Sequence, residues 1–298
     1  MNAITQATAG QIKQISRFGG DAIEKLVVEL GLDKDGAQLV ITRGDEFVAA
    51  IREAASTSLK DLSTTDKFKD EETESTYTYP GEYKGPKPIL EQVQALKALF
   101  PQLDITATLE FVQTVLPTLQ LPAGAEGWFA IPRWQKVADN YGAALEQALA
   151  QLNSKRKFKN YREGELGPDR IRQHPRTVAM LEQIGEQQTG DILIVPAQYG
   201  MWHRGRSVRR ARECFATHEF GFGAFAGSCM ALVHPERYVR SEELDTDLPG
   251  DEYDYPDDDG RFSHAPILNF NGGRLRFDAH WYDDVYDFYG SVSGFLPQ

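Results

Sequence analysis

A polar segment at residues 57–88 divides this chain and limits what it can fold into. It contains few apolar side chains, and its far end holds Pro80, Pro86 and Pro88 together with two glycines. Such a segment cannot bury enough apolar surface to fold by itself. We therefore predict a flexible linker, or an arm that lies on a larger body. The alternative is a long surface excursion within one domain.

Apolar residues recur at helical spacing before this segment, from Ile12 to Leu32 and again from Phe47 to Ile51. Gly19 and Gly20 punctuate the first run, and Asp45 is a suitable N-cap for the second. Residues 1–56 are therefore predicted to form a small helical unit.

Residues 89–298 mix helical stripes with short apolar runs. The runs at 128–132 and 191–196 are compact, and each is closed by proline, which is typical of buried strands. Residues 267–278 have Asn271-Gly272-Gly273 at their centre, and such steps supply the positive φ angles of a tight hairpin turn. We predict an α+β fold in which a small helical N-terminal unit, a polar linker and a larger mixed domain follow one another.

The composition excludes several classes of protein. With 298 residues, of which 41% are hydrophobic, the chain can bury a sizeable core. It shows no apolar stretch long enough for a membrane helix and no secretory signal, and its two cysteines cannot make a disulfide scaffold. A net charge of -12 argues against a general nucleic-acid coat or a binder of anionic membranes. We expect a cytoplasmic protein without a membrane partner.

The chain changes character near residue 160, because all its lysines precede that point and fourteen arginines follow it. Residues 155–212 hold thirteen basic and six acidic side chains, a local charge of +7. Residues 241–298 hold three basic and fourteen acidic ones, a local charge of -11. The two blocks can simply pair with each other. Alternatively, the basic block binds a phosphate-bearing ligand and the acidic block holds a divalent cation.

The sharpest local feature is the segment VPAQYGMWHRGRSVRRAR at residues 195–212. Its order predicts a strand, a loop in which Gly205 lets backbone approach a ligand, and a helix capped by Ser207. Arginine suits planar pairing with phosphate or carboxylate. The spaced glycines of a P-loop are absent. The predicted ligand-binding residues are Arg204, Arg206, Ser207, Arg209 and Arg210.

A metal site is a second hypothesis. Residues 250–266 place Asp257, Asp258 and Asp259 beside turn-forming residues, and hard cations such as Mg²⁺ or Mn²⁺ favour carboxylate ligands on a tight turn. The spacing is not that of an EF-hand, and a solvated acidic loop is the alternative. In an enzyme His203 would move protons, which makes it the predicted catalytic residue.

Two Cys and two His residues form a set that can bind zinc. Cys214 and His218 are four residues apart, and Cys229 and His234 are five apart. The first pair falls on an apolar helical stripe, and the spacing matches no standard zinc module. We expect core packing and not zinc.

The C-terminal half resembles uncharacterised predicted bacterial proteins. The resemblance is carried by VPAQYGMWHRGRSVRRAR, EFGFGAFAGSCMALVHPER, GDEYDYPDDDGRFSHAP and YGSVSGFLPQ, within residues 158–298. It implies a bacterial setting and no activity, cofactor or partner.

Three functions follow from these observations. The first is binding of a phosphate-bearing ligand, with nucleic acid among the candidates, at the arginine-rich helix start. The second is a structural or interaction protein with a protein partner, in which the Arg and Asp blocks pair within or between subunits. The third is a metal-dependent enzyme acting on phosphoesters. The sequence leaves open whether the protein is an enzyme.

Overall fold

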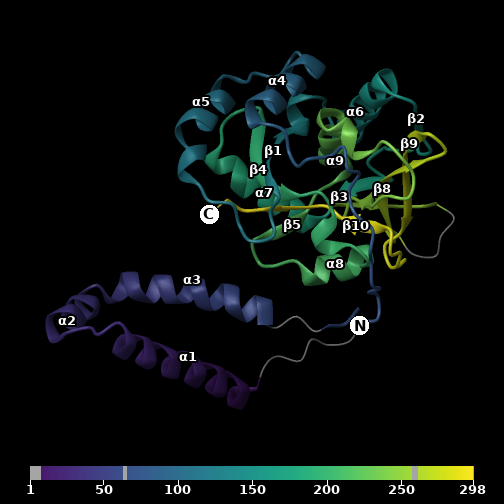
Figure 1. Cartoon of the computed structure of the whole chain (residues 1–298). Helices are drawn as coiled ribbons and strands as arrows, with labels where there is room; N and C mark the ends of the chain where they lie inside the picture. Colours follow the sequence, from purple (N-terminus) through teal and green to yellow (C-terminus); the bar gives the residue numbers. More distant parts are fainter. Residues whose placement is uncertain (1–7, 63–65, 257–260, 298) are drawn as a thin grey trace. The chain divides into compact units, whose positions relative to one another are not determined.

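The elements between Ala9 and Leu62 are all helices, and the first strand begins at Gly127. A computed structural model describes residues 8–62, 66–256 and 261–297 (Figure 1). Contacts divide the chain into two units, Met1–Thr65 and Asp66–Gln298. Helices and strands are mixed in the second unit, and the predicted α+β class is confirmed.

The N-terminal unit consists of the helices α1 (Ala9–Glu29), α2 (Lys34–Thr42) and α3 (Gly44–Leu62). Asp33 caps α2 by accepting a hydrogen bond of 2.7 Å from Gly36 N. Helix α3 begins at Gly44, so the predicted cap Asp45 lies inside its first turn. It also continues to Leu62, past the predicted end of the unit at residue 56. Within the described residues, none of the helices has both the length and the apolarity that crossing a bilayer requires.

In residues 66–256 and 261–297 the structure shows six α-helices, and two of them have clear local signals. Asn140 caps α6 through a hydrogen bond of 2.9 Å from Ala143 N. Pro175 opens α7, where a missing N–H has no cost. The helices are α4 (Ile89–Leu99), α5 (Thr106–Thr114), α6 (Tyr141–Lys155), α7 (Pro175–Gln187), α8 (Val208–Cys214) and α9 (Ala224–Val233). The 3-10 turns are η1 (Leu116–Thr118), η2 (Trp134–Lys136), η3 (Met201–His203) and η4 (Pro235–Arg237).

The described residues of the larger unit form two sheets. The first has the strand order β1-β4-β11-β5 and is antiparallel throughout, with strands β1 (Gly127–Pro132), β4 (Ile192–Gln198), β5 (Glu219–Gly221) and β11 (Ser293–Phe295). The second has the order β10-β6-β8-β7-β3, and β9 joins β2 to β8. Its strands are β2 (Phe158–Asn160), β3 (Ile171–Gln173), β6 (Asp245–Asp247), β7 (Asp251–Tyr253), β8 (His264–Asn271), β9 (Arg274–Trp281) and β10 (Tyr289–Ser291).

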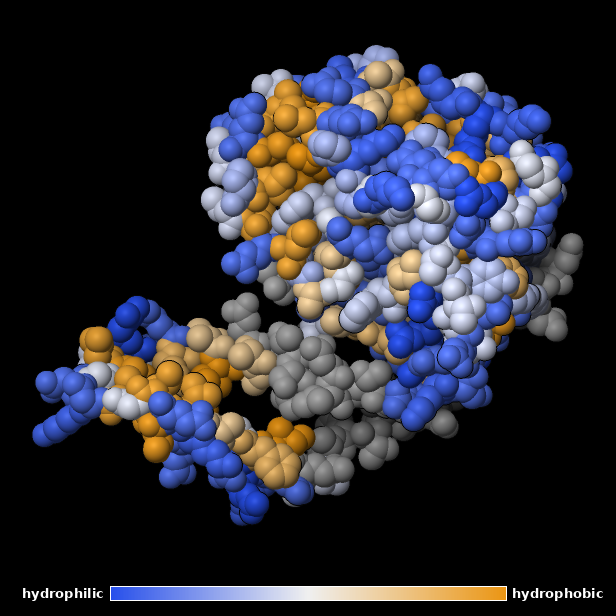
Figure 2. Space-filling view, in the orientation of Figure 1, coloured by the Kyte–Doolittle hydropathy of each residue, from blue (hydrophilic) through white to orange (hydrophobic). Residues whose placement is uncertain are grey.

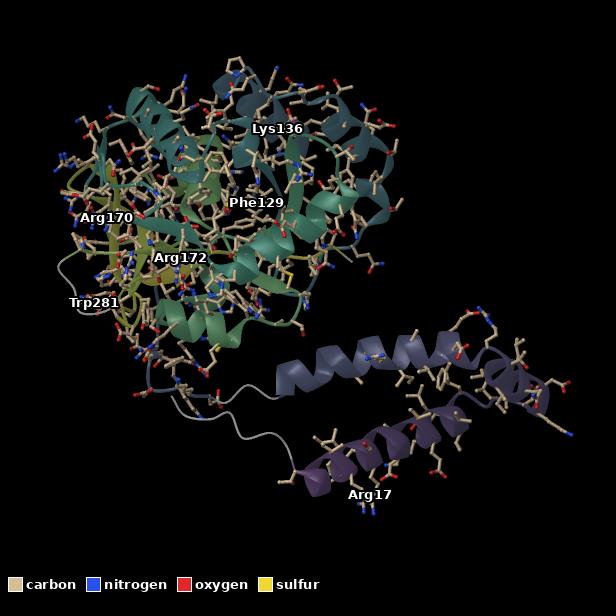
Figure 3. All side chains as sticks on the ribbon, turned by 180° about the vertical axis from the view of Figure 1, so that it is seen from behind. Arg17, Phe129, Lys136, Arg170, Arg172 and Trp281 are labelled. Carbon is tan, nitrogen blue, oxygen red and sulfur yellow. The ribbon has the colours of Figure 1, made fainter. Side chains whose placement is uncertain are left out.

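Helix α9 lies at the centre of the core and is buried almost all round. Ala226 and Met230 belong to one hydrophobic cluster, which includes Phe129 (labelled in Figure 3), whereas Cys229 belongs to the other. Gly227 allows close packing, because a Cβ there would lie 2.2 Å from a methyl carbon of Leu248. This explains why a run of small residues serves as a central helix.

The predicted hairpin is confirmed as β8–β9, with Gly272 and Gly273 at φ of 61° and 72°. The helix predicted from Ser207 is shorter than its apolar stripe suggested. It ends at Cys214, and residues 219–221 form β5, because they pair with β11 from far along the chain. Helix α9 therefore starts after this strand, at Ala224.

Residues 66–88, which we call the arm, belong to the larger unit. Thr73 N donates to Gly205 O at 2.7 Å, and Leu244 N donates to Thr78 O at 3.0 Å. Tyr83 is buried among core aromatic residues. The linker predicted at 57–88 thus differs from the structure at both ends, since α3 covers its first residues and the arm packs against the larger unit.

Candidate functional site

The predicted strand, loop and helix around residues 195–212 are present. The 3-10 turn η3 connects β4 to α8. Ser207 caps α8, because its Oγ accepts a hydrogen bond of 3.1 Å from Arg210 N, as the sequence predicted. Gly205 has φ of 72°, and a Cβ there would lie 2.2 Å from Thr73 O. The absence of a side chain at Gly205 therefore lets the backbone of the arm approach closely. The sequence had predicted that a ligand would occupy this position.

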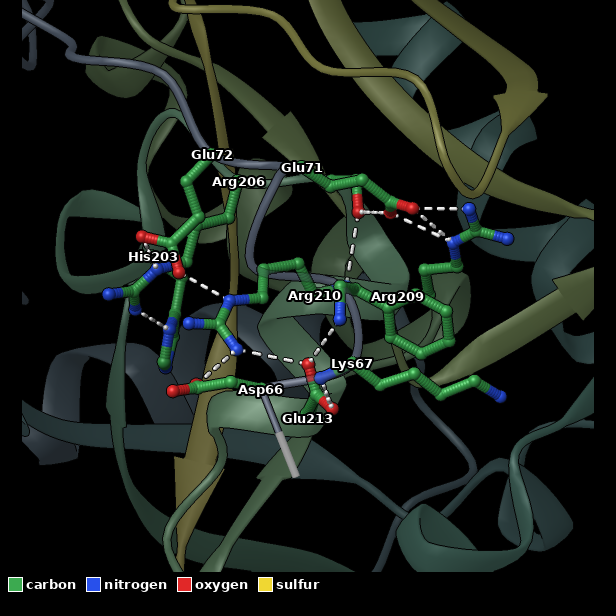
Figure 4. Close-up of polar contacts among 11 residues, drawn as sticks. Asp66, Lys67, Glu71, Glu72, His203, Arg206, Arg209, Arg210 and Glu213 are labelled. Atoms are coloured by element: carbon green, nitrogen blue, oxygen red, sulfur yellow. Dashed lines mark hydrogen bonds and ion pairs between the residues drawn. The ribbon is translucent and has the colours of Figure 1, made fainter. Parts of the chain in front are cut away.

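Arg209 pairs with an acidic side chain of the arm (Figure 4). Its Nε lies 2.8 Å from both carboxylate oxygens of Glu71. The Oγ of Ser207 donates to the same carboxylate at 2.6 Å. Burial opposes ionisation of Glu71, but the hydrogen bonds from Arg209 and Ser207 outweigh it, so the pKa lies below its ordinary value. The start of α8 thus already holds an anion supplied by the chain itself.

Arg210 is the most heavily paired arginine of this segment. It contacts Glu72, and its Nη1 lies 3.0 Å from Asp66 Oδ1 and from Glu213 Oε2. Arg206 shares Glu72, at 3.5 Å. Most of the positive charge that was predicted to bind a ligand is therefore neutralised within the chain.

Arg204 faces a different part of the arm. Its Nη1 donates to Tyr77 O at 3.2 Å and approaches Met201 Sδ at 3.0 Å. All four predicted arginines thus contact the arm or the loop that carries them.

His203 is 1% exposed and has a partner on each ring nitrogen. Arg206 donates to Nδ1 at 2.9 Å, so Nε2 carries the proton and donates to Glu219 Oε1 at 2.7 Å. Ser293 Oγ donates to the same Glu219 oxygen at 2.5 Å. This geometry gives His203 a role in holding η3, β5 and β11 together, and it does not favour the predicted proton transfer to a ligand.

The predicted metal ligands Asp257, Asp258 and Asp259 lie outside the described residues. Nearby, Glu252 pairs with Arg172 at 2.7 Å and lies 4.0 Å from Arg212, so members of the two charge blocks do meet. Among the residues that the structure describes, no group of three or more His, Cys, Asp or Glu side chains is placed to hold a metal ion. The Mg²⁺ or Mn²⁺ site stays a prediction.

The Cys and His residues that were considered as zinc ligands lie in the following environments. Cys229 is fully buried in the core, and its pKa is raised by burial. His234 accepts a hydrogen bond from Lys87 N at 3.1 Å through Nε2, and its Nδ1 lies 3.1 Å from Met230 O. Cys214 lies at the end of α8.

A cavity of about 300 Å³ lies between the start of α7, helix α8 and Phe68, and we call it the arginine cavity. Three guanidinium groups line it, together with His174 and one carboxylate. The lining residues are Phe68, His174, Arg176, Arg209, Arg212, Glu213, Phe215, Gly221 and Pro249. The carboxylate, Glu213, pairs with Arg210 and accepts backbone hydrogen bonds from Lys67 and Phe68.

Two arginines of this cavity, Arg212 and Arg176, donate to backbone carbonyl groups, whereas Arg209 pairs with the carboxylates of Glu71 and Asp283. Arg212 donates to Pro249 O at 2.9 Å and to Asp251 O at 2.8 Å, whereas its carboxylate neighbour Glu252 is 4.0 Å away. Arg176 donates to Ala216 O. Because the carbonyl partners of Arg212 are neutral, they fix its guanidinium without cancelling its charge.

His174, which lines the arginine cavity, has a lowered pKa. Burial lowers its pKa to about 4, and the charges of Arg212 and Arg176 contribute to the shift. The imidazole is therefore neutral at pH 7, and its Nδ1 accepts a hydrogen bond of 3.2 Å from Arg176 N at the start of α7. An anion entering the cavity would meet arginines and no histidine cation.

Only Arg209 of the predicted ligand-binding residues lines the arginine cavity. Arg176 was missed, although the His174-Pro175 step before it signals a helix start. Arg212 lies in the predicted basic run, but only the fold brings it beside α7. The carboxylates of the arm were missed because their segment was interpreted as a linker.

Comparisons with known proteins found no matching family model, no matching curated protein and no matching solved structure.

Proposed function

We propose that the larger unit binds a small ligand through a phosphate group in the arginine cavity. The observation that carries this proposal is the convergence of Arg176, Arg209 and Arg212 on one cavity of about 300 Å³. Guanidinium groups match the geometry of phosphate oxygens and hold their charge at every physiological pH. A phosphate would also provide a negative charge to neutralise the Arg212 guanidinium, which its neutral carbonyl partners cannot provide.

Size and charge favour a compact ligand over a nucleic-acid strand. The cavity accommodates a phosphate with a small organic group, and pockets of this size commonly hold such molecules. The net charge of -12 repels a polyanion, which needs a wide positive surface along its backbone.

Calorimetric titration with inorganic phosphate tests this proposal. We expect binding that weakens with salt, and at least about tenfold weaker binding (~1.4 kcal/mol) in Arg212→Met and in Arg176→Met. Arg240→Met is the matched control, because Arg240 is half exposed, pairs with Glu82 and does not line the cavity. Unchanged affinity in both cavity variants, with their fold intact by circular dichroism, would rule out this site. Labelled single-stranded DNA in the same experiment separates nucleic acid from small phosphates.

A second function is favoured by the N-terminal unit, namely association with a second copy of the chain. Of the twenty large apolar side chains that are exposed in the described residues, twelve lie in this unit, and Figure 2 shows apolar surface along it. Ile12, Ile15, Phe18, Val28 and Leu30 are among them. Isolated helices of this length are marginal in water unless an apolar face is covered.

A second copy suits this unit in length and charge. Helices α1 and α3 have 21 and 19 residues, so two copies can supply four helices of matched length to one bundle. Residues 1–65 hold seven basic and nine acidic side chains, a charge of only -2 out of -12, so two units repel each other weakly.

Light scattering after gel filtration tests this association. We expect the wild-type chain to be a dimer and the Phe18→Glu variant to be a monomer, because the substitution places a charge on the apolar surface that the second copy would cover. Arg17→Glu is the matched control, since Arg17 is three-quarters exposed on the same helix (Figure 3). A monomeric wild-type chain, or a dimer that survives Phe18→Glu, would refute the association.

A further inference from the structure

A second cavity, of about 460 Å³, opens beside the ends of β1 and β3, and we call it the aromatic cavity. Its walls come from η2, α6, α7 and α9. Aromatic and aliphatic side chains dominate them, chiefly Ile131, Trp134, Tyr141, Leu181 and Phe225. The volume and the apolar walls are those of a small-molecule site. None of these residues lines the arginine cavity.

The side chains of Trp134 and Tyr141 each carry a hydrogen-bond donor, and hydrogen bonds from these donors hold the rings in place. Trp134 Nε1 donates to Gln173 Oε1 at 3.0 Å, and the hydroxyl of Tyr141 donates to Asp251 Oδ2 at 2.5 Å. The rings lie 5.9 Å apart at 85°, which forms a corner. Because both side chains are already fixed, a ligand ring can pack against them without restricting their motion further. This reduces the entropic cost of binding.

The hydrogen bonds of one guanidinium at this cavity, that of Arg133, all go to neutral carbonyl groups, and the carboxylate of Asp191 acts on it only through its charge. Arg133 donates from Nε to Gly190 O at 2.9 Å and from Nη2 to Gly185 O at 3.1 Å and to Gln188 O. Within the described part of the chain Arg133 forms no ion pair, and its Nη1 makes no hydrogen bond. Arg172, the other lining arginine, is already paired with Glu252. Nη1 of Arg133 is therefore a donor through which a ligand anion can pair with this guanidinium.

We propose that the aromatic cavity binds a small aromatic carboxylate. Its ring packs in the corner of Trp134 and Tyr141, and its carboxylate accepts a hydrogen bond from Arg133 Nη1. This site is separate from the arginine cavity and does not depend on the function proposed there.

Calorimetric titration of the full chain with 2-naphthoate, and with uncharged 2-naphthamide, tests the proposal. We expect naphthoate to bind at least tenfold more tightly than the amide, because only the acid carries the charge that Arg133 recognises. Leu181→Trp fills the cavity from α7 and is expected to abolish binding. Leu121→Trp is the matched control, because Leu121 is exposed and does not line the cavity.

Several outcomes would overturn this assignment. One is the absence of naphthoate binding at millimolar concentration, and another is equal binding of the amide. Binding that persists in Leu181→Trp but is lost in Arg212→Met would place the carboxylate in the arginine cavity. Naphthoate binding that is unchanged in Arg212→Met supports a separate site, even if phosphate does not bind at all.

Discussion

At the scale of single residues, Asp251 has an unusual position, because it caps a helix from elsewhere in the chain. Residue Gly223 precedes α9 and has no side chain to cap it, so Asp251 Oδ2 accepts the hydrogen bond of 2.6 Å from Ala224 N. A Cβ at Gly223 would lie 2.3 Å from Asp251 Oδ1, so glycine is required there. Burial raises the pKa of Asp251 to about 7, although Tyr141 and Ala224 both donate to it.

The raised pKa of Asp251 predicts a pH dependence of stability. Between pH 4 and pH 7 the folded chain keeps a proton that the unfolded chain, with the ordinary pKa of 3.8, has released. The contribution of Asp251 to the free energy of unfolding therefore falls as pH rises through this window, by about 1.4 kcal/mol per pH unit. Asp251→Asn keeps an oxygen acceptor and removes the titration. Urea unfolding from pH 4.5 to 7.5 should show a shallower fall in the variant, and parallel curves would contradict this.

Asp254 provides a control of opposite sign. The N–H of Phe262 donates to it at 3.0 Å and, with Arg261, holds its pKa below the ordinary value. Its contribution is present above the unfolded pKa and is lost as pH falls through the folded one. Asp254→Asn should therefore lower stability at pH 7 and change it little at pH 3.

At the scale of elements, the arm and α8 form one electrostatic unit. Glu71 and Glu72 reach across 138 positions of sequence to Arg209 and Arg210. The arm has few apolar anchors, such as Tyr83, so these ion pairs and the backbone bond from Thr73 fix its path. The arm thus also controls how much charge Arg209 presents to the arginine cavity.

Glu71→Gln tests this coupling. The substitution leaves Arg209 without its buried carboxylate, so we expect the free energy of unfolding to fall by about 1–3 kcal/mol and proteolysis of the arm to speed up. Phosphate affinity should rise severalfold, since Arg209 lines the cavity. Glu74→Gln is the control, because Glu74 is exposed on the same arm. Equal stability of the two variants would contradict a clamping role.

Local signals predicted some elements, and long-range pairing decided the others. The hairpin turn at Gly272 and Gly273, the strands β1 and β4, and the cap at Ser207 follow from neighbouring residues. The end of α8 does not, because β11 recruits residues 219–221 into a sheet. The arginine cavity was equally hidden, since Arg176 and Arg212 meet only in three dimensions.

At the scale of the whole molecule, burial is divided unevenly. Both hydrophobic clusters are built from residues of the larger unit, and none of the residues of Met1–Thr65 for which the structure describes side-chain burial is buried. The larger unit therefore draws its stability from its own core, whereas the N-terminal unit would need the association that we propose in order to cover its apolar faces.

Removal of residues 1–65 tests this division. We expect the remaining chain to keep its melting temperature within a few degrees and to bind phosphate as the full chain does, because every described core residue is retained. It should elute as a monomer. Loss of cooperative melting would show instead that the larger unit depends on the N-terminal helices.

The place of β11 has a consequence for synthesis. Residues 293–295 lie in the first sheet between β4 and β5, which are made some seventy to a hundred residues earlier. That sheet cannot close while the ribosome still holds residue 295, so β4 and β5 wait with unpaired edges during translation. A nascent chain stalled before residue 293 would expose the unpaired edges of β4 and β5 to chaperones. Once β11 has left the ribosome, it can pair with both strands and complete the sheet.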